Sequence, residues 1–466
     1  MTIDWKEEVT KRKDNLLNDL ISMLKIKSVY DPHNATSTMP LGPNIKKGLD
    51  QFLAIATRDG FTTKNIDNIV GEISYGKGDE TLGILSHVDV VPAGDGWDSD
   101  PFKPVIKNDN IYARGASDDK GPAIACYYGL KIIKELGLPV HKKVAFIVGT
   151  DEEGSWRGMD YYFKHMPMPD FGFSPDAEFP IINGEKGNIS FDAKFGNVSE
   201  GKYQLTKFKA GLRENMVPRD AMAWIKADDY KEIIQKFDEF IAVNPVVGSA
   251  DIQDDQLFIH VIGKAAHAQE PKDGINAGTY LTTFLNQFDI QGDAHDFIAF
   301  IAEKLHLDSR CNNFDMAYSD KVMGDLTVNP GLMNFDKENG GIVTLNFRYP
   351  EGIGPDYIAN GLDKVQDHYG IKFIKHTNGM IPHYVASDDP LVKTLLNVYH
   401  EQTDEPAYTH VVGGGTYGRL MKRGVAYGAL FPNVPNVMHQ PNEFMPVENI
   451  MKAAAIYAQA IYELIK

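Results

Sequence analysis

Hydrophobic and polar residues alternate in blocks over the first 184 residues of the chain. Short apolar runs, such as TLGIL at 81–85 and VAFIVG at 144–149, have the length of buried strands. Between and after these runs, residues 121–137 and 158–166 carry apolar side chains at helical spacing. This order of strand and helix predicts an α/β domain in which helices flank a central, mostly parallel sheet.

Two helices are expected before the first of these strands. Apolar residues recur at helical spacing from Trp5 to Leu24, which indicates one amphipathic helix. Residues 42–60 indicate a second helix, which Gly60 closes.

The pattern changes near residue 186. Strand-like segments such as 188–196 mix with helical segments such as 228–241, which is typical of an α+β domain. After about residue 383 the chain returns to helices and short apolar strands. We therefore expect a discontinuous first domain, residues 1–184 and 383–466, with a second α+β domain, residues 185–382, inserted into it.

Acidic residues and histidines stand where the predicted strands end. In a parallel sheet the carboxyl ends of the strands lie along one edge, and ligands bind there. The residues at these ends, or in loops that precede a helix, are His87, Asp89, Asp118, Asp119, Asp151, Glu152, Glu153, Asp176 and His439. We expect these side chains to converge on this edge.

Each of these residues, taken alone, is better explained by an ordinary structural role, such as a core histidine or a helix cap. Taken together, the carboxylates would repel one another strongly unless a cation neutralised them. Imidazole and carboxylate ligands without thiolate suit Zn²⁺, Mn²⁺ or Co²⁺. The ligands are too many for one catalytic zinc ion, so the sequence predicts two divalent metal ions that share a carboxylate.

The overall charge narrows the classes of partner. With 64 acidic and 47 basic residues, the formal net charge of -17 disfavours binding to nucleic acid or to anionic membranes.

No stretch approaches the roughly 20 apolar residues that span a bilayer, and the charged N-terminal segment has no apolar secretory core. Only Cys126 and Cys311 occur, which suits a reducing compartment. We expect a cytoplasmic protein.

Five motifs resemble those of a known family. In order along the chain they are SHVDVVPAGDGW, ARGASDDKGP, GTDEEG, SPDAE and MHQPNE. They are similar to the metal-site motifs of the aminoacylase, carboxypeptidase and dipeptidase family of two-metal peptidases. Segments such as NGEKG, FKAG, NFRYP and GGGTYGR extend the resemblance, from end to end, to the PepV-type bacterial dipeptidases. The resemblance implies a hydrolase, specifically a metalloprotease with a zinc-exopeptidase-like catalytic domain and an inserted lid domain.

The resemblance also implies a role for each residue of the predicted site. His87 and Asp176 would bind one metal ion, Glu153 and His439 the other, and Asp118 would bridge them. Asp118 is chosen over Asp119 because the family pattern has one residue between the bridging aspartate and the lysine, here Lys120. Glu152 would be the general base that takes a proton from metal-activated water, and Asp89 would orient the His87 ring.

In the inserted domain the resemblance implies that His267 stabilises the developing oxyanion. Arg348 would grip the terminal carboxylate of the substrate, a task suited to a bidentate guanidinium. The other implied substrate-binding residues are Asn215, Gly413, Gly414, Gly415 and Thr416. PepV-type enzymes supply the oxyanion histidine within one chain, so we expect a monomer that acts on small peptides, dipeptides above all.

Three other interpretations compete with this one. Gly413, Gly415 and Gly418 match the G-x-G-x-x-G pattern of a dinucleotide-binding turn, but this motif alone is weak and leaves the acidic cluster unexplained. A peptide-binding protein with a structural metal would not need a base such as Glu152 beside an open metal. Within the enzymes, an N-acyl amino acid deacylase, such as a succinyl-diaminopimelate desuccinylase, shares the metal motifs and remains the alternative function.

Overall fold

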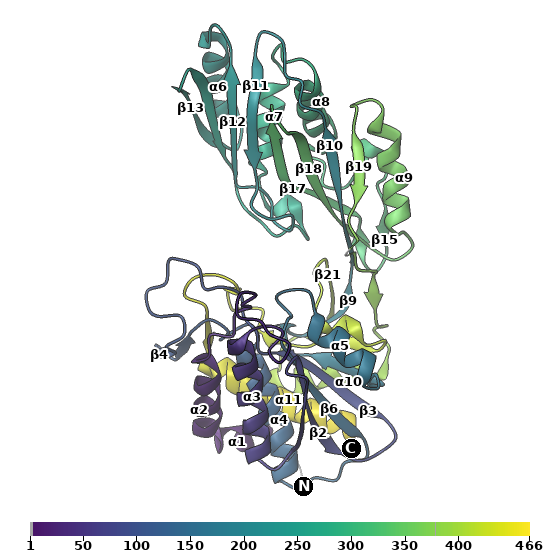
Figure 1. Cartoon of the computed structure of the whole chain (residues 1–466). Coiled ribbons are helices and arrows are strands. Elements are labelled where there is room, and N and C mark those ends of the chain that lie inside the picture. Colours follow the sequence, from purple (N-terminus) through teal and green to yellow (C-terminus); the bar gives the residue numbers. More distant parts are fainter. Residues whose placement is uncertain (1–2, 378) are drawn as a thin grey trace. The chain divides into compact units, whose positions relative to one another are not determined.

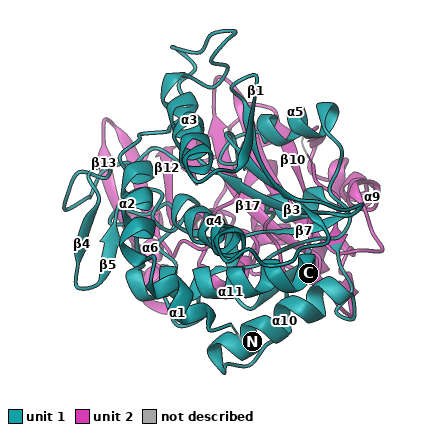
Figure 2. Cartoon of the chain, turned by 90° about the horizontal axis from the view of Figure 1, so that it is seen from below, with its two compact units in different colours: residues 1–184, 384–410, 415–466 teal, residues 185–383, 411–414 magenta. Residues whose placement is uncertain are grey.

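The chain forms two compact units, which are shown in different colours in Figure 2. The computed structural model describes residues 3–377 and 379–466. Unit 1 comprises residues 1–184, 384–410 and 415–466, and unit 2 comprises residues 185–383 and 411–414. Each unit has its own hydrophobic core.

Unit 1 is built on a mixed sheet in the order β1-β2-β6-β3-β7-β22-β9-β20, with β21 paired to β9. Its strands are β1 (Thr62–Ile66), β2 (Val70–Gly76), β3 (Thr81–His87), β6 (Lys143–Gly149), β7 (Phe171–Ser174), β9 (Ile181–Glu185), β20 (His383–Tyr384), β21 (Thr409–Val412) and β22 (Gly424–Ala426). The four central strands, β6, β3, β7 and β22, are parallel, whereas β1 and β2 pair antiparallel. The predicted α/β class is confirmed, and the parallel part of the sheet is its centre.

Helices cover both faces of this sheet (Figure 1). They are α1 (Trp5–Thr10), α2 (Lys13–Leu24), α3 (Pro43–Arg58), α4 (Lys120–Glu135), α5 (Arg157–His165), α10 (Pro390–Thr403) and α11 (Val447–Ile465), together with the 3₁₀ turn η4 (Tyr417–Leu420). Successive strand residues face opposite sides. Ile84 therefore lies in the core formed with α1–α4, α10 and α11, whereas Leu85 lies in the smaller core formed with α5 and η4.

The N-terminal helical pattern, predicted as one helix from Trp5 to Leu24, is divided at residues 11–12 into α1 and α2. Arg12 marks the break: its guanidinium donates to the backbone carbonyl and carboxylate of Glu8 and to the carboxylate of Glu135 on α4. Periodicity does not reveal this break because the apolar residues of both helices face the same core.

Unit 2 is an antiparallel sheet in the order β13-β14-β12-β11-β17-β18-β10-β19. The strands are β10 (Gly187–Phe195), β11 (Gln204–Ala210), β12 (Asp220–Lys226), β13 (Val247–Gln253), β14 (Gln256–Ile262), β17 (Thr327–Asp336), β18 (Gly340–Tyr349) and β19 (Lys372–Lys375). Strand residues such as Phe208 and Phe335 share a core with Phe297 of α8 and Phe284 of α7. The unit has the α+β character expected of residues 185–382.

The helices of unit 2 are α6 (Lys231–Val243), α7 (Ala277–Leu285), α8 (Asp293–Phe300) and α9 (Pro355–Gln366). Short helical turns lie at η1 (Pro271–Asp273), η2 (Ile301–Leu305) and η3 (Asn312–Phe314).

The remaining strands of the described residues form three small sheets. Two belong to unit 1: β24 (Phe444–Pro446) with β5 (Asn110–Tyr112) and β4 (Val105–Lys107), and β23 (Ala429–Leu430) with β8 (Ala177–Glu178). The third, in unit 2, pairs β15 (Ser319–Asp320) with β16 (Gly324–Asp325).

One short segment falls in a different unit from the domain we predicted for it. Residues 411–414 were expected in the domain formed by 1–184 and 383–466, but they group with unit 2. The backbone N–H of Lys186 donates to the Val412 carbonyl, and the Arg348 guanidinium donates to the Gly413 carbonyl at 2.7 Å. These contacts link residues far apart in sequence, so the apolar pattern of the segment gives no sign of them.

Within residues 3–377 and 379–466, none of the helices combines the length and the apolar character that a membrane span requires.

Candidate metal centre

Parallel strand ends bring the first candidate ligands together in unit 1. In the register of β3 and β6, His87 pairs with Gly149, so both strands end at the same level. Glu152 and Glu153 follow the end of β6, and Asp176 follows the end of β7, which lies on the other side of β3. These four side chains therefore lie at or just beyond the carboxyl ends of three neighbouring parallel strands.

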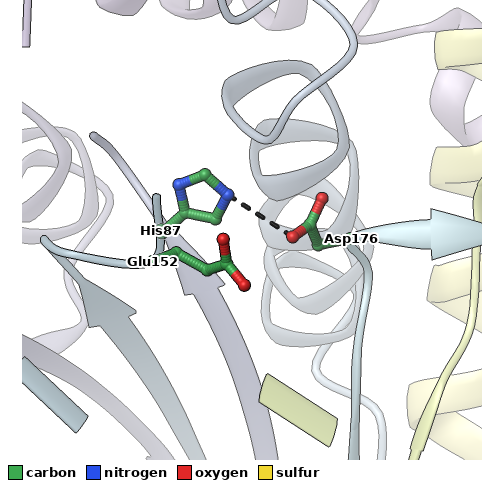
Figure 3. Close-up of side chains that lie close together, drawn as sticks. All are labelled: His87, Glu152 and Asp176. Carbon is green, nitrogen blue, oxygen red and sulfur yellow. Dashed lines mark ion pairs between the residues drawn. The ribbon is translucent and has the colours of Figure 1, made fainter. Parts of the chain in front are cut away.

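His87, Glu152 and Asp176 form one group of potential ligands. One ligand atom from each lies within 4.8 Å of those from the other two. The His87 ring is fully buried, and its Nε2 is 3.4 Å from Oδ2 of Asp176. Figure 3 shows the ring and the two carboxyl groups turned toward a common space.

Asp118, Glu153 and His439 form a second such group. Nε2 of His439 is 2.9 Å from Oδ2 of Asp118 and 3.0 Å from Oε1 of Glu153. His439 lies in a turn and has a left-handed backbone, with φ of 63°. It reaches this group from a part of the chain more than 250 residues beyond the others.

Asp118 joins the two groups. Its Oδ1 is 3.1 Å from Nε2 of His87, and its Oδ2 is 2.9 Å from Nε2 of His439. One carboxylate therefore has an oxygen beside a histidine of each group, which is the arrangement expected of a ligand that two cations share.

Asp89 contacts both groups from outside. Nδ1 of His87 is 3.0 Å from the backbone carbonyl of Asp89 and 3.4 Å from its Oδ1. Because a carbonyl can only accept, Nδ1 carries the proton, which leaves the lone pair of Nε2 facing the carboxylates. Oδ2 of Asp89 also accepts a hydrogen bond from the backbone N–H of Glu153. β3 ends at His87, so Asp89 reaches this position from the following loop rather than from the strand.

Burial and mutual repulsion disturb the protonation of these carboxyl groups. Burial, reinforced by neighbouring carboxylates, holds the pKa of Glu152 well above its usual range. The same two causes raise the pKa of Glu153 to about 7. Burial opposes the charged form of His439, but hydrogen bonds to Asp118 and Glu153 outweigh it and raise the pKa of that imidazole to about 11. The site therefore favours added positive charge.

The donor atoms fit a divalent cation better than they fit one another. Although Nε2 of His87 and Oδ1 of Asp118 are 3.1 Å apart, both are buried and neither makes a hydrogen bond of acceptable geometry to any described residue. Buried polar atoms of this kind need a partner. Imidazole nitrogen and carboxylate oxygen are ligands of Zn²⁺, Mn²⁺ and Co²⁺.

Buried residues that the sequence reasoning left without a role surround Asp118. Asp119 is fully buried, and its Oδ2 accepts the backbone N–H of His87. Lys120 is also buried and donates to the backbone carbonyls of Met23 and Ile26. Glu443 is fully buried against the same loop. The signal for Glu443 was its presence in the motif MHQPNE, in which only the histidine had been given a role.

Most of the predicted substrate-binding residues lie in unit 2. The backbone N–H of Ala268, next to His267, donates to the Asn215 carbonyl, so the loops that carry these two residues are paired. Arg348 is buried, and its guanidinium contacts Oδ1 of Asn346 and the Gly413 carbonyl. Gly414 also belongs to unit 2, whereas Gly415 and Thr416 belong to unit 1. The roles assigned to these residues stay predictions.

Comparison of the sequence with known proteins identifies the family. Residues 83–463 match the model of the peptidase family M20/M25/M40. A beta-Ala-Xaa dipeptidase from Lactobacillus delbrueckii subsp. lactis is 44% identical to this chain, over 100% of this chain and 99% of that protein.

Solved structures show the same fold at low sequence identity. Human carnosine dipeptidase 1 aligns with a TM-score of 0.55 and 14% identity, over 99% of this chain and 98% of the other. An aminoacylhistidine dipeptidase from Vibrio alginolyticus aligns with a TM-score of 0.54 and 15% identity, over 96% of each chain.

The fold, the two ligand groups and these matches define a metal-dependent peptidase. The chain belongs to the peptidase family M20/M25/M40. The family predicted from the five motifs is therefore confirmed, as is the prediction that the protein is an enzyme.

Proposed function

We propose that this peptidase is a dipeptidase that cleaves dipeptides by means of two divalent metal ions. The observation that carries the proposal is the pair of ligand groups in unit 1 with Asp118 between them. A single carboxylate between two histidines suits a dinuclear site better than one structural ion. The name of the Lactobacillus relative, a beta-Ala-Xaa dipeptidase, supports a dipeptide as the substrate.

Five side chains would hold the metal ions. His87 and Asp176 would bind one ion, Glu153 and His439 the other, and Asp118 would bind both. When bound, the two ions would lower the pKa of a water molecule and polarise the peptide carbonyl. Zn²⁺ is the expected metal, and Mn²⁺ and Co²⁺ suit the same donor set.

Glu152 would act as the general base. Its carboxyl group lies close to potential ligand atoms of His87 and Asp176. It is not needed as a ligand if Asp118 binds both ions. In this role Glu152 accepts the proton of the attacking water and then delivers it to the amine that leaves.

Residues of unit 2 would recognise the substrate and stabilise the transition state. His267 would donate to the oxyanion, and Arg348 would bind the terminal carboxylate with help from Asn215. Gly413, Gly414, Gly415 and Thr416 would present backbone N–H groups to the substrate. A site that binds both ends of a short peptide excludes longer chains, which is the reason to expect dipeptides.

The two cysteines suggest where the protein works. Cys126 is buried in unit 1 and Cys311 in unit 2, and both are free thiols. Free thiols of this kind suit the cytoplasm. We also propose that the enzyme is a monomer, because the inserted domain resembles the enlarged domain with which PepV-type enzymes supply the oxyanion histidine within one chain. A stable dimer in gel filtration with light scattering would contradict the proposed monomer.

A substrate panel measured with controlled metal content tests the proposed function. The protein is stripped with a chelator and then assayed with Zn²⁺, Mn²⁺ or Co²⁺ on dipeptides, tripeptides and N-acyl amino acids. We expect activity to return with metal and to be highest on dipeptides. A higher kcat/KM for N-succinyl-diaminopimelate than for any dipeptide would instead establish the deacylase alternative. Full activity after complete removal of metal would overturn the proposal.

A further inference from the structure

The loop that carries Asp118 is built around a second carboxylate. Oε1 of Glu443 accepts hydrogen bonds from the backbone N–H groups of Gly115, Ser117 and Asp118, at 3.1, 2.8 and 3.2 Å. Its Oε2 accepts from Gly115 N–H at 3.1 Å and from Arg114 Nη1 at 2.6 Å. The loop is thus a backbone nest for an anion, and Glu443 supplies that anion from within the chain.

The ion pair at this nest is excluded from solvent. The relative exposure of Glu443 is 0% and that of Arg114 is 1%. Burying two charges is costly unless good geometry and further hydrogen bonds compensate, and a buried pair is weak evidence for a stabilising role. Such a pair therefore calls for a reason other than stability, and its contact with the N–H of Asp118 suggests one.

The pair also joins three of the sequence motifs. Arg114 donates to the Ala93 carbonyl, and its guanidinium lies 5.2 Å from the centre of the Trp97 ring. Asn442, next to Glu443, accepts the backbone N–H of Asp98 through its side chain. The ends of the motifs that contain His87, Asp118 and His439 therefore meet at this point.

Glu443 is tied to His439 as well as to Asp118. Only three residues separate it from His439, and its backbone carbonyl accepts the N–H of Ala113. The following residues, Phe444–Pro446, pair with β5. The turn from 439 to 443 is thus fixed at its far end by contacts to the loop that carries Asp118.

We propose that Glu443 is a positioning residue for the metal centre. Through its hydrogen bonds to residues 114–118, Glu443 sets the distance between Asp118 and His439. This inference rests on the proposed two-metal function. In this role Glu443 contacts neither metal nor substrate. Because Asp118 and His439 belong to the same ligand group, the ion held by Asp118, Glu153 and His439 depends on Glu443 most.

The proposal is tested by metal binding rather than by activity alone. Wild type, Glu443→Gln and Glu443→Asp are stripped of metal and titrated calorimetrically with Zn²⁺, and bound Co²⁺ is followed by its absorption spectrum. Loss of a residue that orients metal ligands typically weakens binding by about 10- to 100-fold. We expect a weakening of this size for one of the two ions and a smaller effect on the other. In excess metal, activity should return toward the wild-type level.

The two substitutions separate the charge of Glu443 from its reach. Glu443→Gln keeps the length but loses the charge that Arg114 requires, and it could fail to fold. Glu443→Asp keeps the charge, so Arg114 retains a partner, but it shortens the side chain by one methylene and draws it away from the N–H groups. Circular dichroism and the thermal midpoint establish which variants fold, and Glu443→Asp alone suffices for the test.

Asp19→Asn provides a matched control. Asp19 is a buried carboxylate of α2 that accepts two hydrogen bonds from Arg58 and one from Tyr128. The Asp19→Asn substitution should lower the thermal midpoint and leave the affinities for both metal ions unchanged. If a folded Glu443 variant behaves in the same way, the proposal is overturned. If the wild type itself binds no metal, the proposed function fails instead, so the two failures are distinguishable.

Discussion

At the scale of single residues, the site depends on where a few side chains point. Glu152 and Glu153 are neighbours in sequence, yet their carboxyl groups belong to different ligand groups, one with His87 and the other with His439. Both residues lie in the turn that follows β6, outside the strand. This separation suits the roles proposed for the two residues, with Glu153 as a metal ligand and Glu152 as the general base.

Glu152→Gln should abolish most of the activity without loss of metal. The amide has the same size as the carboxylate but cannot accept and return a proton, and general base catalysis typically contributes about 100- to 10,000-fold to the rate. We expect kcat to decrease by a factor of about 100 to 10,000. A calorimetric titration should show that both metal ions are still bound. Asp160→Asn, which changes an exposed carboxylate on α5, is the control and should leave kcat unchanged. Near wild-type turnover by Glu152→Gln would show that another group is the base.

At the scale of secondary structure elements, helices are joined by partly buried charged groups and by close packing. Asp59, at the C-terminal cap of α3, accepts hydrogen bonds from Arg58, from Tyr127 of α4 and from Lys131 of α4. Burial tends to raise the pKa of Asp59, but these three hydrogen bonds outweigh it and lower the pKa to about 2.

Asp59→Asn should therefore destabilise the protein in a manner that depends on pH. A carboxyl group whose pKa is lowered by folding stabilises the native state above its ordinary pKa of 3.8, and this stabilisation is lost as the pH falls toward about 2. At pH 6 we expect the variant to lose about 1–3 kcal/mol in free energy of unfolding. Urea denaturation should show the difference from wild type shrinking between pH 4 and pH 2. A difference that stays constant over this range would contradict the assigned role of Asp59.

Helices α4 and α11 pack closely at Gly129. A Cβ atom at this position would lie 2.7 Å from the backbone nitrogen of Ala458 and 2.9 Å from the carbonyl carbon of Tyr457. Gly129→Ala should gain up to about 1 kcal/mol in helix propensity but lose typically 1–3 kcal/mol by overpacking.

We therefore expect Gly129→Ala to lower the free energy of unfolding, as measured by denaturant titration. Gly48→Ala on α3 is the matched control, because its Cβ would be at 3.4 Å or more from its nearest neighbours. That variant should be neutral or more stable. Equal stability changes in the two variants would show that packing at Gly129 does not limit the approach of the helices.

At the scale of the whole molecule, the chain has two units with separate cores, and both ligand groups belong to unit 1. A ligand that binds only the native state stabilises it in proportion to the logarithm of its concentration relative to Kd. Metal should therefore stabilise unit 1 directly.

Removal of metal should change the thermal unfolding of one unit. In differential scanning calorimetry we expect chelation to lower the midpoint of the transition of unit 1 by several degrees, since about 1 kcal/mol corresponds to a few degrees in domains of this size. The transition of unit 2 should stay in place. Re-addition of Zn²⁺ restores the first midpoint, and Mg²⁺ at the same concentration is the control. Equal shifts of both transitions would contradict independent unfolding of the units.

The sequence by itself determined the elements and the kinds of ligand. Strands β3, β6 and β7 and helices α3, α4 and α11 follow from apolar periodicity, because burial of one face is a local property of the sequence. His87, Glu152 and Asp176 could be expected together because parallel strands end at one edge. The resemblance to two-metal peptidases, carried by five ordered motifs, added the expected roles of His439 and Asp118 and the family itself.

The tertiary structure decided the contacts that join distant parts of the chain. Only the fold shows that Glu443 occupies the nest at 114–118, that Asp119 binds the backbone of His87, and that residues 411–414 belong to unit 2. Periodicity shows which face of an element is buried but not which distant segment covers it. A buried carboxylate gains its role from the N–H groups around it, and those groups are assembled only when the chain folds.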